Sequence, residues 1–181
     1  DATGMSRQHY RSAMKDLGKL IAMGVTPCAN GGHTLRTRAG HCLQCNTARF
    51  AFQKRFEDTA DVYIAGSRKG GFLKIGVAGS AKERMNSLRH LAYAGQIDWE
   101  LITVFHSTKA GQIEFLAQKD VSAFAFPTIY LRDGIEVSCL ETFKCKSSRA
   151  LEAITKFLDK HGFQTEFEKE AFEYFDSLGE A

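Results

Sequence analysis

The pattern of hydrophobic and polar positions predicts a helical start, then a stretch with few bulky apolar residues, then a longer mixed region. Residues 6–23 carry apolar side chains at helical spacing and predict an amphipathic helix that Gly24 ends. From Cys28 to Cys45 the chain is rich in Gly, Cys, His and Arg, so this stretch cannot form a hydrophobic core unaided. Residues 47–57 predict a short basic helix.

The remaining chain predicts strands and helices in mixed order. Strands are expected at 61–65, 71–76, 99–105, 128–131 and 136–140, and helices after Ser80, at 108–124 and at 147–160. The tetrapeptide that begins at Ser80 has a capping-box pattern, which satisfies the first N–H groups of a helix. We therefore expect an α+β fold, with a small and mostly antiparallel sheet flanked by helices.

These patterns divide the chain into three expected parts. An N-terminal helix and metal-binding element covers 1–59, an α+β domain covers 60–160, and an acidic amphipathic tail covers 161–181. In the tail, apolar residues recur at helical spacing among a dense set of acids. Either this helix caps the domain core, or its acids compete with a polyanion or its apolar stripe binds a protein partner.

The formal charge of +3 is unevenly distributed. Residues 165–181 hold six acids and one base, whereas residues 1–164 carry +8. A basic body suits a polyanionic partner, because each neutralised phosphate releases counterions. The candidate nucleic-acid contacts lie in an acid-free stretch: Arg36, Arg38, Arg49, Lys54 and Arg55. The alternative is a solvated charged surface.

Hydropathy and the N-terminus bear on the compartment. No apolar run approaches the roughly 20 residues that a membrane span needs, so we expect no membrane partner. The N-terminus lacks the basic-then-apolar pattern of a secretory signal, so we expect a cytoplasmic protein.

Cysteine spacing predicts a metal site. The four expected ligands are Cys28, His33, Cys42 and Cys45, with His41 as the less favoured substitute for His33. A two-residue gap lets both sulfurs of a knuckle reach one ion, and three thiolates with one imidazole satisfy tetrahedral zinc. Because four protein ligands leave no open position for water, we expect a structural Zn²⁺.

The first two predicted strands bring chemistry-bearing residues together if they pair as a hairpin. Alternation then places Tyr63 and Lys74 on one shared, non-core face. Gly76 has no side chain and would let a substrate backbone approach closely, and Arg84 lies early in the next helix. A phenol, an amine and a guanidinium suit phosphodiester cleavage, which needs a positioned water and cations on the phosphate oxygens.

These residues resemble the signature of the GIY-YIG nuclease family. Val62-Tyr63-Ile64, Lys74-Ile75-Gly76 and then Arg84 have the order and spacing of its motifs. The resemblance covers about residues 60–158, with Lys where the family name has Tyr, as in the phage-related and some restriction-enzyme branches.

The resemblance implies a role for each matched residue. Tyr63 would act as general base or water orienter, Lys74 as its assistant and Arg84 as a phosphate ligand. Glu114 would be the catalytic glutamate that binds one divalent ion, with Glu141 as the second candidate.

The expected function is therefore metal-dependent endonuclease activity on nucleic acid, and DNA is the expected substrate. Its cofactors would be a structural Zn²⁺ and a catalytic Mg²⁺ or Mn²⁺. Two alternatives stay open: a zinc-dependent nucleic-acid-binding module whose nuclease-like half is inactive, and a protein-interaction domain.

Overall fold

The computed structural model describes residues 1–132 and 134–178, apart from the side chain of Phe52. The chain divides into two compact units, Asp1–Phe56 and Glu57–Ala181, which are described separately. Among the described residues, every helix is too short or too polar to cross a membrane.

The first unit is small and has its own core. Its elements are α1 (Arg7–Asp16), β1 (Ile21–Ala22), β2 (Arg36–Thr37) and α2 (Thr47–Glu57). The α1 helix buries Tyr10 and Met14, one turn apart, against Ala22 and Val25. The two short strands pair antiparallel.

The α1 helix is shorter than the apolar spacing predicted. It ends at Asp16, and Gly18 has a φ of +63°, which ends helical geometry. Ile21, expected in the helix, instead begins β1. The prediction over 6–23 was wrong in its second half, because the apolar residues there serve a turn and a strand.

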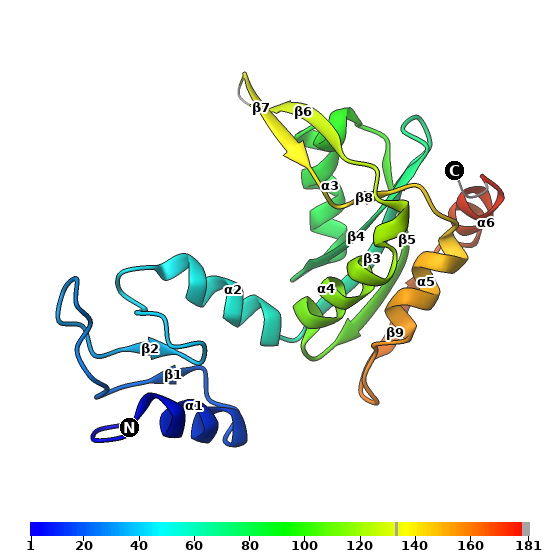
Figure 1. The fold of residues 1–181 in the computed structure, drawn as a ribbon. Helices are drawn as coiled ribbons and strands as arrows, with labels where there is room; N and C mark the ends of the chain where they lie inside the picture. The colour runs from blue at the N-terminus through cyan, green and yellow to red at the C-terminus, as the bar shows by residue number, and fades with distance from the viewer. Residues whose placement is uncertain (133, 179–181) are drawn as a thin grey trace. The chain divides into compact units, whose positions relative to one another are not determined.

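The second unit is built on a five-stranded antiparallel sheet (Figure 1). Its strands are β3 (Ala60–Ser67), β4 (Phe72–Ala78), β5 (Trp99–Ser107), β8 (Thr142–Phe143) and β9 (Phe163–Phe167). Their order is β8-β4-β3-β5-β9, and every neighbouring pair is antiparallel. The predicted α+β class with an antiparallel sheet and flanking helices is confirmed.

One face of the sheet packs against three helices, α4 (Ala110–Asp120), α5 (Ser147–Thr155) and α6 (Lys169–Ser177) (Figure 1). Val62 and Ile64 of β3 lie in this core with Ile113 of α4. Phe175 of α6 packs so closely over Gly66 that a Cβ there would lie 2.3 Å from its ring. Glycine at 66 is therefore required by the packing of α6.

The opposite face carries a second core. It is covered by α3 (Ala81–His90), the 3₁₀ turn η1 (Tyr93–Gly95) and the hairpin of β6 (Thr128–Arg132) and β7 (Ile135–Cys139). A further 3₁₀ turn, η2 (Ser122–Phe124), follows α4. Tyr63 pairs with Gly76 and Ala65 with Lys74, so Tyr63 and Lys74 share this face as predicted. Its description as a non-core face was wrong, because α3 and the hairpin bury it.

The C-terminal residues are part of the second unit. β9 pairs with the edge of β5, and α6 buries Ala171 and Phe175 in the first core. The predicted tail over 161–181 thus contributes a strand and a core helix within its described residues. The strand was not predicted from the sequence. Four of the five residues of β9 are exposed, so buried and exposed positions do not alternate along it.

We expect Phe175→Ala to lower the free energy of unfolding of the second unit by about 3–5 kcal/mol, the usual loss for a buried phenylalanine. Phe175 is 1% exposed, whereas Phe163, the matched control, is 57% exposed. Urea unfolding followed by fluorescence measures this, because the single tryptophan, Trp99, is buried in the second unit. Equal midpoints for Phe175→Ala and Phe163→Ala would contradict a core role for α6.

Candidate metal centre and active site

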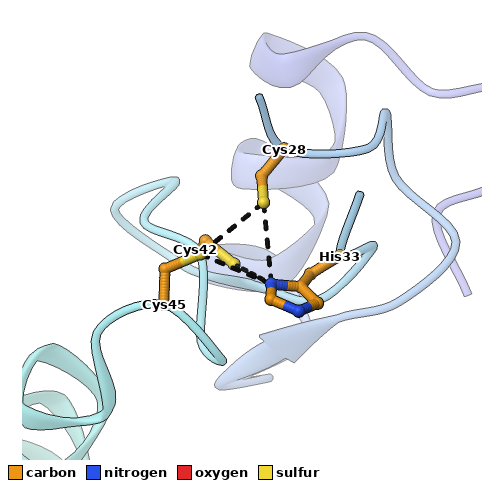
Figure 2. A group of neighbouring side chains, drawn as sticks. All are labelled: Cys28, His33, Cys42 and Cys45. Carbon is orange, nitrogen blue, oxygen red and sulfur yellow. Dashed lines mark hydrogen bonds between the residues drawn. The ribbon is translucent and has the colours of Figure 1, made fainter. Parts of the chain in front are cut away.

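Four predicted ligands converge in the first unit (Figure 2). Their ligand atoms, from Cys28, His33, Cys42 and Cys45, all lie within 4.8 Å of one another. His33 presents Nδ1, which lies 3.7 Å from Cys28 Sγ, 3.6 Å from Cys42 Sγ and 3.4 Å from Cys45 Sγ. The sulfurs of Cys28 and Cys45 are 3.7 Å apart.

These distances match the edges of a tetrahedral metal site. With metal–sulfur bonds of about 2.3 Å and metal–nitrogen bonds of about 2.05 Å, the edges are about 3.6 Å for S···N and about 3.8 Å for S···S. The cluster can therefore hold a metal ion such as zinc.

Backbone hydrogen bonds shape the two ligand loops. Cys28 N donates to His33 O at 3.0 Å, and Gly32, with a φ of +66°, donates to Cys28 O at 2.9 Å. Arg36 binds across these loops, donating to the carbonyls of Thr26 and His33, both at 2.9 Å. Arg36 was predicted to bind nucleic acid, but its guanidinium is engaged in holding the metal loops.

The cysteine thiols of the cluster differ in pKa. Although burial acts to raise it, the backbone N–H groups of Gly31 and His33 lower the pKa of the Cys28 thiol to about 6. Hydrogen bonds with Cys42 and Cys28 raise the pKa of the Cys45 thiol to about 11. Thiols this close resist ionising together, because neighbouring thiolates repel one another. A bound cation would offset this repulsion and displace the thiol protons.

We expect His33→Gln to lose the bound metal and His41→Gln to retain about one equivalent of it, with zinc as the expected ion. His41 is the matched control, because it adjoins Cys42 yet is exposed and outside the cluster. Elemental analysis of freshly purified, reduced protein measures the metal. If His33→Gln keeps the metal and His41→Gln loses it, His41 rather than His33 is the ligand.

A second polar group lies on the α3 face of the second unit, around the ring of Tyr93. Lys74 Nζ donates to Glu141 Oε2, and the Tyr93 hydroxyl donates to the same oxygen at 3.4 Å. Lys74 Nζ also lies 5.2 Å from the centre of the Tyr93 ring, and the Arg84 guanidinium lies 6.0 Å from it. Two cations and a carboxylate thus gather around one phenol.

Burial differs sharply within this group. The side chain of Lys74 is 1% exposed, whereas that of Glu141 is 45% exposed. Burial, a hydrogen bond with Cys139 and the nearby Glu141 carboxylate raise the pKa of the Tyr93 phenol far above its usual range. Tyr93 therefore stays protonated and acts as a donor.

Tyr63 belongs to the same face and is also buried. A Cβ at Gly76 would lie 2.4 Å from the Tyr63 hydroxyl, so glycine at 76 makes room for this phenol. Gly76 was predicted as a place where a substrate backbone approaches. The structure gives another reason for this glycine, because Tyr63 occupies the space above it.

Tyr93 is a site residue that sequence reasoning missed. Its neighbours Ala92 and Ala94 have φ of 44° and 56°, left-handed values that are rare for alanine. Trp99 Nε1 donates to Tyr93 O at 2.9 Å and holds this turn. Strained backbone often occurs where a side chain must be aimed, and here it holds the Tyr93 ring close to both Lys74 and Arg84.

Asp61 positions the helix that carries Arg84. One Asp61 oxygen accepts from Ala81 N at 3.0 Å, at the start of α3, and the other lies 2.9 Å from His106 Nδ1. The predicted cap is also present, because Ser80 Oγ accepts from Glu83 N at 3.3 Å. The start of α3 is thus tied to β3, which places half-buried Arg84 one turn into the helix.

Glu114 lies on α4, on the side of the sheet opposite Tyr63. Four residues later, Gln118 Nε2 donates to Ile75 O at 2.9 Å, directly before Gly76. Residues four apart share one face of a helix, so half-buried Glu114 lies on the α4 stripe that reaches the β4 strand. Of the two candidate glutamates, Glu141 is the one bound to Lys74.

The other predicted nucleic-acid contacts lie in the first unit. Arg49, Lys54 and Arg55 are exposed on α2. Arg38 donates to Lys19 O through Nε and Nη2, at 3.3 and 3.2 Å. These residues are accessible to a polyanion, which leaves their role a prediction.

Comparisons with known proteins found no match to the chain among family models, curated proteins or solved structures.

Proposed function

We propose that the chain is a metal-dependent endonuclease that hydrolyses nucleic-acid phosphodiesters, with DNA as the expected substrate, through a GIY-YIG-type site. The gathering of Lys74, Arg84 and Glu141 around Tyr93 carries the proposal. A scissile phosphate needs cations for its oxygens and an aligned donor or base for water, and this group offers both.

Each residue has a role that follows from its contacts. Arg84, half-buried on α3, would bind a non-bridging phosphate oxygen with its planar fork. Lys74 would add a second positive charge, held in place by Glu141. Tyr63 would orient the attacking water, assisted by Lys74 on the neighbouring strand.

Two carboxylates are candidates to hold a divalent ion: Glu141 beside Tyr93, and Glu114 on α4 at the other side of the sheet. Mg²⁺ and Mn²⁺ take oxygen ligands, and Mg²⁺ is often held by one or two carboxylates together with waters and phosphate oxygens. Glu114 is proposed as the metal ligand, because Glu141 already shares an oxygen with Lys74 and Tyr93. When bound, the metal would stabilise the departing oxygen.

Zinc is the proposed ion of the first unit. Its role would be structural, because the four ligands close the tetrahedron and the hydrophobic core cluster described for this unit has five buried residues: Ala2, Tyr10, Met14, Ala22 and Val25.

A second function is favoured by one specific observation. Tyr63 and Lys74 are each 1% exposed, which suits residues of a protein interior as well as catalytic residues that open on substrate binding. The alternative is therefore a zinc-dependent nucleic-acid-binding or protein-interaction module whose nuclease-like unit is inactive.

We expect Arg84→Ala to lower the cleavage rate by about 10²-fold or more, because it removes a charge from the transition state. The matched control is Lys82→Ala on the same helix, whose side chain is 75% exposed and pairs with half-buried Glu166. The measurement is plasmid and single-strand cleavage at equal protein concentration.

Metal dependence in that assay is tested by omitting Mg²⁺ or Mn²⁺ rather than by adding chelator, because a chelator would also strip the zinc site. Equal rates for Arg84→Ala and wild type would remove Arg84 from the site. Intact nucleic-acid binding without metal-dependent cleavage by wild type would select the inactive-module alternative.

Glu114→Gln and Glu141→Gln separate a metal ligand from a positioning residue. We expect both to cut more slowly, with excess Mn²⁺ partly restoring only Glu114→Gln. Glutamine keeps the shape but removes the charge that holds the ion, and a higher concentration of metal offsets weaker binding. The lower rate of Glu141→Gln would result from misplacement of Lys74, so a higher metal concentration should not restore it.

The measurement is the cleavage rate of each variant as Mn²⁺ is titrated. If Glu141→Gln is restored by Mn²⁺ and Glu114→Gln is not, the two assignments must be exchanged.

A further inference from the structure

A stripe of positive side chains runs along the exposed face of α1. Arg7, Arg11 and Lys15 are spaced four residues apart, so they succeed one another at intervals of about 6 Å along the helix. The adjacent face of α1 buries Tyr10 and Met14, which lie three residues after Arg7 and Arg11. The stripe borders this buried face, and all three of its residues are exposed to solvent.

The stripe borders a hollow of about 670 Å³ on the first unit. The lining residues are Arg7, Gln8, Arg11, Ser12, Lys15 and Arg38. Four of these six residues are basic and none is acidic. We call this surface the α1 groove.

Two of its arginines are held by main-chain carbonyls rather than by carboxylates. Arg7 Nη2 donates to Ala39 O at 3.4 Å, and Arg11 Nε donates to Arg38 O at 3.0 Å. Within the described part of the chain, no carboxylate lies within ion-pair distance of Arg7, Arg11 or Lys15. These contacts orient the guanidinium groups and leave their charge uncompensated.

The stability of α1 does not explain this arrangement. Like charges four residues apart repel one another on a helix, and Arg7 in the first turn opposes the helix dipole. The α1 helix has no acid in its first turn to offset this. An anion in the groove would relieve both effects.

The charge of the whole unit points the same way. Residues 1–56 contain nine Lys and Arg but two acids, a formal +7, whereas residues 57–181 contain fifteen Lys and Arg and nineteen acids, a formal −4. Even with Zn²⁺ and three thiolates, the first unit keeps a charge of +6.

We infer that the α1 groove binds the phosphate backbone of nucleic acid. This inference rests on the proposed function only for the choice of ligand. The regular spacing of the cations suits a polyanion with repeating charges, and the absence of aromatic side chains from the lining indicates contacts with phosphates rather than bases.

The test is binding of a short fluorescein-labelled DNA duplex by the full, zinc-loaded chain without Mg²⁺ or Mn²⁺. The dissociation constant is measured over a range of salt concentrations for wild type and for the triple variant Arg7→Gln/Arg11→Gln/Lys15→Gln. The matched control removes the same charge from exposed positions of the second unit: Lys82→Gln/Lys119→Gln/Lys160→Gln.

For the groove variant, we expect the slope of log affinity against log salt to fall by about two to three, because each lost phosphate contact removes about 0.9. At roughly 0.1 M salt this corresponds to a loss of affinity on the order of 10²-fold. The control should change the slope by less than about one.

Ser12→Arg is a second variant that adds a charge to the groove and should steepen the slope by about one. If the triple variant loses its metal, the salt slope of Ser12→Arg alone tests whether the α1 groove binds DNA. Equal slopes for the groove and control variants, no steepening with Ser12→Arg, or binding of polyglutamate in place of DNA would each overturn the inference.

Cleavage is a separate readout. A chain that binds DNA through the groove but cuts no substrate keeps this inference and refutes the proposed function. If the chain cuts DNA and the groove variants leave its salt slope unchanged, the proposed function is kept and this inference is refuted.

Discussion

The pairing register of β3 with β4 is the constraint on which the second unit depends. It sets Tyr63 opposite Gly76 and Ala65 opposite Lys74, and it sends Val62 and Ile64 to the other side. Both faces are buried, so a slip of one residue would place the Lys74 ammonium among the apolar side chains of the first core and expel Ile75 from it. Packing on each face therefore enforces the register that the other face needs.

Burying Lys74 in the sheet imposes a second requirement. An ammonium group that is 1% exposed is tolerated only with a partner, and Glu141 supplies one from the chain between β7 and β8. Glu141 also accepts from Tyr93, whose turn is strained at Ala92 and Ala94. The positions of the β6–β7 hairpin, the η1 turn and the β3–β4 pair are thus coupled through one carboxylate oxygen.

The parts of the site that local spacing determines were predictable, and the parts that long-range contacts determine were not. Cys28 and Cys45 lie in one loop-rich stretch, so their spacing alone indicates a metal site. Lys74 and Glu141 are 67 residues apart, and no periodicity reports that their side chains meet. The α1 helix shows the opposite error, because apolar spacing continued past Gly18, where the backbone turns left-handed. Exposed β9 gave no alternation to detect.

The uneven charge of the two units bears on an electrostatic problem of the proposed reaction. Carboxylates that hold a divalent ion also repel the phosphate backbone, and the second unit, with its formal −4, attracts a polyanion poorly. Binding energy obtained away from the reacting phosphate can offset this repulsion without altering the site. The first unit, with a formal +7 and the α1 groove, has the charge to provide it. With the proposed structural zinc, the fold of this unit would depend on metal binding, so metal loading, polyanion binding and cleavage would be linked in that order.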